Sequence, residues 1–265
     1  RPVGYDLYPA LMRSCARLTY NQVLDALQGA PLGASGTLDG LKGCAMGQGI
    51  DDAIMQRVES LSGFAQARIA CRQAAGGLDF EFPEARVILD GSGKPCGVDL
   101  RVKNQATSLV EEAMILANEV VAAHLHERDF PALYRVHEKP SPDSLAALLP
   151  VLSEFSWFNR ISPERFVAGD AHAVQQVLSE SQGRLEADLV QALVLRAMKR
   201  ACYKPECEGH YGLASAAYAH FTSPIRRYPD LVVHRMLRAQ LIRRPQRFEQ
   251  EVAALEKRYM SEALK

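Results

Sequence analysis

The chain has 265 residues, of which 48% are hydrophobic and 23% are charged, and its 31 Lys and Arg balance its 31 Asp and Glu. This size and composition fit one large globular domain or two small ones, and they exclude a disordered or fibrous protein. No apolar run approaches the roughly 18 to 20 residues that cross a bilayer, so we expect no membrane span.

The six cysteines are scattered along the chain, a pattern typical of reduced thiols in a cytoplasmic protein rather than of a disulfide framework. Cys202, Cys207 and His210 form a C-x4-C-x2-H triplet, and His220 would complete a set of four zinc ligands. Structural zinc sites usually show two tight ligand pairs, whereas this triplet has a single loose pair. We therefore rank a small zinc-binding protein last among the possible functions.

The first segment, residues 3–18, carries Tyr, Leu and Val near alternation and predicts a long strand. Thr19 is a fair N-cap for a helix that Gly29 and Pro31 end. Residues 29–49 contain seven glycines and little periodicity, which indicates a surface loop.

An amphipathic helix is predicted to begin at Asp51 and Asp52 and to stop at Gly76 and Gly77. We interpret the two aspartates as acids at the helix N-terminus, where they interact favourably with the helix dipole. The apolar face of this helix is expected to contain Ile54, Val58, Leu61 and Ala65.

Residues 78–103 contain two β-type runs, then the turn DGSGKP and a third run, which together predict a small meander. The next helix should be capped by Thr107 or Ser108 and extend over residues 109–128. It is apolar over more than one stripe and should be largely buried, with Glu111 and Glu112 in its first turn.

The rest of the chain reads mainly as helix, so the fold class is α/β in the broad sense of mixed α+β, with helix outweighing strand. The predicted elements are a short strand at 132–138, helices near 142–155, 162–181 and 184–203, a helix begun at Pro224, and a last helix from about Pro245.

Residues 218–241 carry the clearest chemical signal. Thr222 or Ser223 can cap the helix that Pro224 opens, because proline needs no N–H at the first helical position. Free amides at such a helix start attract an anion, and Arg226 and Arg227 add two guanidinium groups. We therefore expect a phosphate as the ligand. Basic charge is also concentrated here, with ten Lys or Arg against five Asp or Glu from residue 226 to the end.

Helical spacing places Arg226, Asp230 and His234 in a line, one turn apart from each other. From the spacing alone, surface ion pairs on a solvated helix are the simpler interpretation of this line.

Five ordered blocks resemble the RNB catalytic domain of the ribonuclease R and ribonuclease II family, more closely its ribonuclease R branch. The strongest is HFTSPIRRYPDLVVHR, which follows GHYGLASAAYA. The other blocks are SCARLTYNQV (14–23), VEEAMILANEVVAAHL (110–125), ALYRVHEKPS (132–141) and VLRAMKRACYKPECEGHYGLA (194–214).

The resemblance implies a mixed sheet wrapped by helices and a processive 3'-to-5' exoribonuclease. Such an enzyme threads single-stranded RNA into a channel and releases nucleoside 5'-monophosphates. Two Mg²⁺ ions would activate water and neutralise phosphate oxygens. We further expect a cytoplasmic protein without a membrane anchor, and take a monomer as the default for an oligomeric state that the sequence leaves open.

Site residues carry over by matching motif positions. Arg226 matches the family's catalytic arginine, and Arg227 beside it is expected to bind substrate. Tyr20 matches a tyrosine beside the scissile phosphate, Glu111 a glutamate on the ribose near the 3' end, and Phe80 an aromatic that stacks on a terminal base. Without the block agreement, Tyr20 would be read as a half-buried strand-end tyrosine, Glu111 as a dipole partner and Phe80 as core.

The family's four-aspartate metal cluster has no counterpart in this sequence. Asp51 and Asp52 echo the end of that motif but follow Tyr20, which is the wrong side of it. The resemblance thus implies that residues 1–265 correspond to the C-terminal two-thirds of a single RNB domain, with the metal ligands upstream and no activity in the isolated chain. The alternative is a non-catalytic RNA-binding or assembly module of the same fold.

Overall fold

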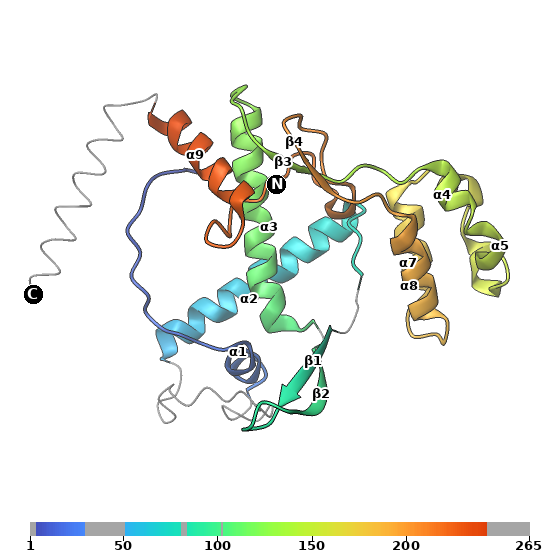
Figure 1. Cartoon of the computed structure of the whole chain (residues 1–265), viewed down its shortest axis with the longest axis horizontal. Helices are drawn as coiled ribbons and strands as arrows, with labels where there is room; N and C mark the ends of the chain where they lie inside the picture. Colours follow the sequence, from blue (N-terminus) through green and yellow to red (C-terminus); the bar gives the residue numbers. More distant parts are fainter. Residues whose placement is uncertain (1–3, 30–50, 81–83, 102, 243–265) are drawn as a thin grey trace, which may run out of the picture. The chain divides into compact units, whose positions relative to one another are not determined.

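The computed structural model describes residues 4–29, 51–80, 84–101 and 103–242, and these form two compact units (Figure 1). The small unit comes from Ala16–Ala113, and the large unit from Arg1–Cys15 together with Met114–Lys265. Helix α3 (Gln105–His126) contributes its first turns to the small unit and the remainder to the large unit.

The predicted strand at the start of the chain is wrong for residues 4–18, which form neither strand nor helix. A strand needs a hydrogen-bonded partner, and the strand pairs within the described residues lie elsewhere, one within residues 84–101 and one between residues 134–136 and 202–204. The side chains of Tyr8 and Met12 are 67% and 95% exposed, so their alternation marks no buried face, whereas Leu7 packs against the core of the large unit.

The first helix of the small unit, α1 (Tyr20–Leu27), begins where its sequence predicts. The Thr19 side chain accepts from the Gln22 amide, and the Gln22 side chain accepts in return from the Thr19 amide. This reciprocal pair is a capping box, which satisfies two amides that the first turn leaves free. The loop predicted at 29–49 lies almost entirely outside the described residues.

The second helix, α2 (Asp52–Ala74), is capped by Asp51, whose carboxylate accepts from the Ala53 amide. The predicted apolar face is confirmed in part: Ala65 is buried, and Ile54 and Val58 are partly buried, but Leu61 is 37% exposed. The buried residues of α2 are polar as well as apolar. They are Ser62, Ala65 and Arg72.

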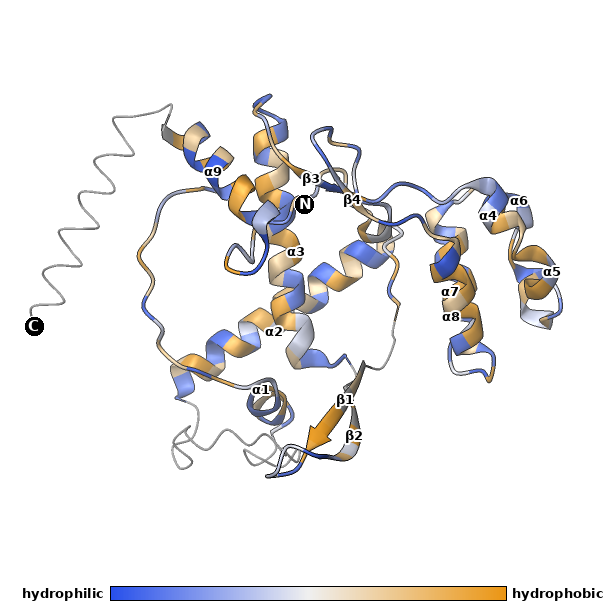
Figure 2. Cartoon of the chain, viewed as in Figure 1, coloured by the Kyte–Doolittle hydropathy of each residue, from blue (hydrophilic) through white to orange (hydrophobic). Residues whose placement is uncertain are grey.

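Strands β1 (Glu84–Leu89) and β2 (Pro95–Arg101) form an antiparallel hairpin around the predicted turn. Asp90 stabilises that turn by accepting hydrogen bonds from the amides of Ser92 and Lys94. Residues 78–80 form no strand, so the first run of the predicted meander is wrong where it is described. Figure 2 colours the end of β1 as strongly hydrophobic, although Val87 and Leu89 are more than half exposed.

Helix α3 begins earlier than predicted because Asn104, and not Thr107 or Ser108, caps it. The Thr107 amide donates to Asn104 Oδ1, and the Asn104 amide donates to Thr107 Oγ1, both at 3.0 Å. The earlier start moves Glu111 and Glu112 out of the first turn, where we had expected them. The helix is otherwise largely buried, as predicted.

In the large unit, β3 (Tyr134–Val136) pairs antiparallel with β4 (Cys202–Lys204). The predicted strand at 132–138 is therefore confirmed, while β4 replaces the end of the helix predicted at 184–203. The core beside this pair is built from α3, β3 and α9 (Tyr228–Ile242). Its buried members are Val121, Ala122, Leu125, Tyr134, Val136, Ala219, Val233 and Leu237.

The helices predicted between 142 and 181 are present but broken into shorter pieces. Gly169, with a φ of +64°, separates two of them, because only glycine adopts that conformation without strain. The pieces are α4 (Pro142–Ala146), α5 (Leu149–Leu152), a 3₁₀ turn (Ser156–Arg160), α6 (Pro163–Val167) and α7 (Ala171–Ser181). Helix α8 (Ala187–Ala197) follows, within the helix predicted at 184–203.

The mixed, helix-rich fold class is confirmed. Within the described ranges, every helix is too short or too polar to pass through a membrane. The helix predicted from Pro245 lies outside the described residues.

Candidate functional site

The loop of residues 221–227 lies between Ala219, in the core, and helix α9. The helix begins at Tyr228 and not at Pro224, so the predicted cap by Thr222 or Ser223 is wrong. The cause is Asp230, which is completely buried and accepts the amide N–H of Ser223 at 2.7 Å. An acid inside the first turn thus holds the preceding residues as a turn.

The second partner of Asp230 is Arg227, three residues before it. Nη2 of Arg227 donates to Oδ1 at 2.8 Å, and Nε lies 2.8 Å from Oδ2, close enough for an ion pair but not aligned as a hydrogen bond. The predicted line of Arg226, Asp230 and His234 is therefore not formed, because the Asp230 carboxylate pairs with Arg227 instead of Arg226. Nor is this a surface ion pair, since the Asp230 side chain is 0% exposed.

The other end of the 221–227 loop is held by helices α3 and α9. The Phe221 amide donates to Oδ1 of Asn118 at 2.9 Å, and Asn118 donates in turn to the Tyr218 hydroxyl. Nε2 of His234 donates to the Phe221 carbonyl at 2.8 Å, and the two rings stack with centroids 4.0 Å apart. Both ends of the loop are thereby fixed to the core of the large unit.

The tip of the loop is presented to solvent. Ile225 is fully exposed and Arg226 is also exposed, whereas Arg227 is three-quarters covered. Among the described residues, no carboxylate forms an ion pair with the Arg226 guanidinium, whose charge is permanent. A fixed backbone with a free guanidinium at its tip is suited to binding an anion.

Two histidines near the loop, His210 and His220, add no charge at neutral pH. Burial, with Arg227 as the next cause, lowers the pKa of His220 to about 4, and Nδ1 of His220 lies 2.7 Å from the Tyr203 hydroxyl. Burial and the neighbouring His137 lower the pKa of His210 to about 3. Both rings are therefore neutral, and the positive charge of this region comes from its arginines.

The small unit carries the other three candidate residues. Tyr20 is the first residue of α1 and is 43% exposed. Phe80 is partly buried at the end of residues 75–80, the segment after α2 that we call the Asp79 turn. The Glu111 carboxylate lies 2.8 Å from Nζ of Lys103, and its side chain is 40% exposed. All three can be reached from solvent within their own unit.

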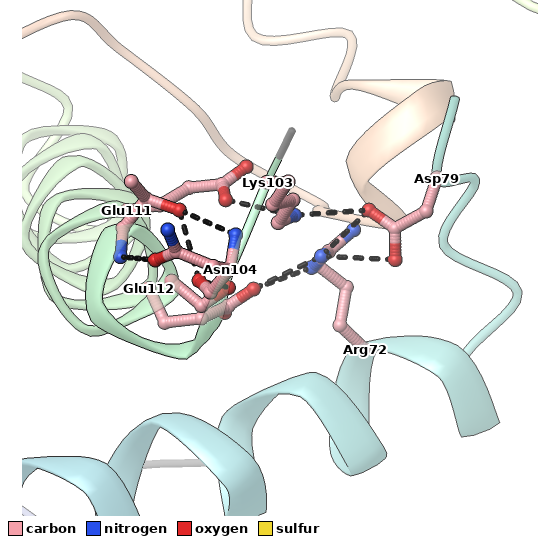
Figure 3. A network of polar contacts seen from close by, with 8 residues as sticks. Arg72, Asp79, Lys103, Asn104, Glu111 and Glu112 are labelled. Atoms are coloured by element: carbon pink, nitrogen blue, oxygen red, sulfur yellow. Dashed lines mark hydrogen bonds and ion pairs between the residues drawn. The ribbon is translucent and has the colours of Figure 1, made fainter. Parts of the chain in front are cut away.

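A buried arginine that the sequence reasoning missed organises this part of the small unit (Figure 3). Nη2 of Arg72 donates to Oδ1 of Asp79 at 3.0 Å and to Oε1 of Glu112 at 2.9 Å, and Nε also donates to Glu112. Burial opposes the charge of Arg72, but Asp79 and Glu112 outweigh it and raise the pKa of the guanidinium. Its signal in the sequence was its place in the buried phase of α2, seven residues after Ala65.

The candidates are thus grouped by unit. Arg226 and Arg227 belong to one anchored loop in the large unit, while Phe80 and Glu111 flank one ionic network in the small unit.

The described residues do not form a metal site. They contain no group of three or more His, Cys, Asp or Glu side chains placed to hold a metal ion. Cys202, Cys207, His210 and His220 therefore give no support to the zinc alternative, and Asp51 acts as a helix cap. No residue of the described ranges is assigned as a magnesium ligand.

Comparison with known proteins identifies the family. A family model described as RNB domain matches residues 2–243. The chain belongs to the RNB domain family. This RNB chain is 37% identical to Ribonuclease R of Aquifex aeolicus over 96% of its own length, and 34% identical to Ribonuclease R of Escherichia coli over 90%. It covers 33% and 27% of those relatives, so it spans between a quarter and a third of their length.

Solved structures agree with the family. The RNB chain matches Mycoplasma genitalium RNase R in complex with ribose methylated single-stranded RNA with a TM-score of 0.70 and 25% identity, covering 90% of the chain and 34% of that protein. The complex of the same enzyme with double-stranded RNA gives a TM-score of 0.64. The family resemblance and the helix-rich mixed fold are therefore both confirmed.

Proposed function

We propose that this RNB chain forms part of a magnesium-dependent exoribonuclease that hydrolyses single-stranded RNA from the 3' end to nucleoside 5'-monophosphates. Its relatives are named Ribonuclease R, and one solved relative holds single-stranded RNA. The observation that carries the proposal is the exposed guanidinium of Arg226, on a loop whose two ends are fixed to a buried core.

In this proposal Arg226 binds the phosphate that is cleaved. Its planar fork can place two parallel hydrogen bonds on phosphate oxygens, which a lysine cannot do. Charge builds up on those oxygens in the transition state, and a donor already held in place stabilises it without reorganisation. The hydrogen bonds of Phe221 and Ser223 supply that fixed position.

Arg227 contributes differently from its neighbour. Its guanidinium is engaged by buried Asp230, so we propose that Arg227 positions the loop and thereby positions Arg226. This role is additional to any contact of Arg227 with substrate. This division also fits the electrostatics, because a buried acid opposite Arg227 neutralises one charge and leaves the other available.

Glu111, Phe80 and Tyr20 would bind the nucleotide. Of the two adjacent glutamates, Glu112 is fully buried against Arg72, whereas Glu111 is partly exposed and able to accept from a 2'-hydroxyl. Phe80 would stack on a base with little sequence preference, and the Tyr20 hydroxyl would donate to a phosphate. The Mg²⁺ ions would supply the nucleophile, with ligands that we expect outside the described residues.

The test is the Arg226→Ala variant of the full-length protein that carries this chain, assayed on 5'-labelled single-stranded RNA with Mg²⁺. We expect kcat to fall at least about 10²- to 10³-fold, the usual cost of one lost transition-state contact, while the Kd for RNA changes little. Arg196→Ala, at an exposed position on α8, is the matched control and should retain full activity. Arg226→Lys should recover only part of the rate.

Equal turnover in Arg226→Ala and the unaltered protein would refute the assignment. RNA binding by the unaltered protein without release of nucleotides would instead favour the non-catalytic RNA-binding module.

A further inference from the structure

One guanidinium in the small unit contacts the sequence neighbours of both Phe80 and Glu111. Arg72 donates to Asp79, the residue before Phe80, and to Glu112, the residue after Glu111 (Figure 3). These partners lie seven and 40 residues from Arg72 along the chain. The arginine therefore joins two segments that the backbone does not connect locally.

The network is closed by Lys103. Its Nζ lies 2.8 Å from Oε2 of Glu111 and 3.7 Å from Oδ1 of Asp79, so it spans the same two segments from the exposed side. Arg72 itself is 3% exposed and cannot reach a ligand in solvent. Its influence on any substrate must pass through Asp79 and Glu112.

The backbone after α2 is fitted closely around Arg72. The Gly77 amide donates to the Arg72 carbonyl at 2.8 Å, and a Cβ at Gly77 would lie 2.6 Å from Cγ of Arg72. Such a contact is far below van der Waals distance, so only glycine permits the chain to turn here toward Asp79. Packing and hydrogen bonding thus independently attach the Asp79 turn to Arg72.

We propose that Arg72 is a positioning residue that holds Phe80 and Glu111 as one pocket for the 3'-terminal nucleotide of RNA, so that base stacking and ribose recognition occur together. This inference rests on the proposed function. Arg72 suits the task because a planar guanidinium presents several donors in fixed directions and can hold two carboxylates at once. A lysine ammonium keeps the charge but lacks this geometry.

The experiment compares kcat/KM for an RNA that ends in a ribonucleotide with the same RNA ending in a 2'-deoxynucleotide. In Arg72→Lys we expect the preference for the ribose end to fall about tenfold, the equivalent of one hydrogen bond to a charged acceptor. Arg57→Lys, at an exposed position on the same helix, should leave the preference unchanged. Asp79→Asn, a change at a partly exposed carboxylate, should lower it in the same direction while preserving the fold.

A purely structural role would reduce the melting temperature and leave the ratio of the two substrates unchanged. That result in Arg72→Lys, or in Asp79→Asn if the first variant does not fold, would overturn the inference while the nuclease assignment stands. Failure of the unaltered protein to degrade RNA would contradict the proposed function itself. Equal use of both ends by the unaltered protein would overturn the inference, because no ribose recognition would then exist for Arg72 to position.

Discussion

The two units each contain an arginine paired with a fully buried carboxylate, and the pairs differ in how far apart they lie in the sequence. In the large unit Arg227 and Asp230 are three residues apart. In the small unit Arg72 and Glu112 are 40 residues apart. Each pair lies next to a charged side chain that solvent can reach, exposed Arg226 in one case and partly exposed Glu111 in the other.

The difference shows two ways of fixing a functional side chain. The Arg227–Asp230 pair closes within one helical turn, so it sets the shape of a loop and needs only α9 and the residues just before it. The Arg72–Glu112 pair exists only once α2 has packed beside α3. We therefore expect changes to the local pair to alter one loop, and changes to the distant pair to alter how two segments meet.

The largest expected effect tests the local pair. Asp230→Asn removes the charge opposite Arg227. The asparagine side chain is also a weaker acceptor than the carboxylate for the hydrogen bonds from Arg227 and from the Ser223 amide. Breaking one partner of a buried ion pair typically costs about 3–5 kcal/mol in the free energy of unfolding. Urea unfolding measures the loss, and kcat should fall with it because Arg226 loses its fixed backbone.

Asp188→Asn on α8 is the control for this change. Asp188 is exposed, so its substitution should lower the free energy of unfolding only slightly. A loss below about 0.5 kcal/mol in Asp230→Asn, the range of ordinary surface changes, would contradict the buried pairing.

The next expected effect is a pH dependence of stability that histidines confer on the large unit. All seven histidines of the chain follow residue 113 and belong to that unit. His210 and His220 have pKa values lowered to about 3 and about 4, from an ordinary value of 6.5, with burial as the main cause. Below pH 6.5 the unfolded chain therefore binds more protons than the folded one. The free energy of unfolding should fall as the pH drops from 6.5 toward 4, by at most about 1.4 kcal/mol per pH unit for each histidine.

Urea unfolding at pH 7 and pH 5 checks this, with the large unit followed through the fluorescence of its Trp157. His210→Phe should make the pH dependence shallower. An unchanged slope in that variant would show that His210 titrates alike in the folded and unfolded states.

The same contrast between local and distant contacts explains what the sequence could predict of the fold. The start of α1 at Tyr20 and the start of α2 at Asp52 were correct, because caps are made by residues within one turn. The strand at 3–18 was wrong, because strand formation depends on a partner that alternation does not reveal. Helix α9 was placed four residues early, since its cap signals were overridden by buried Asp230.

The candidate site follows this rule as well. The motif around Arg226 could be read directly, and the loop that carries it is built from neighbours in the sequence. Arg72 was overlooked because an arginine in a helix normally faces solvent, so its spacing of seven residues from Ala65 did not by itself identify it as buried. Glu111 was chosen over Glu112 from the motif alone. The physical difference between the two glutamates, the burial of Glu112, could be seen only in the structure.

The smallest expected effect tests the most local contact of the small unit. Thr19→Ala removes one half of the capping box of α1 and should cost about 1 kcal/mol. Because the cap holds the helix start, the loss should appear as faster amide exchange over Tyr20–Leu27 and not as a change around Arg72. Ser14→Ala, in the non-helical segment before it, is the comparison and should leave exchange in α1 unaltered. Faster exchange spreading into α2 and α3 would instead mean that α1 supports the packing of the whole small unit. The distinction between local and distant contacts would then not hold for the cap of α1.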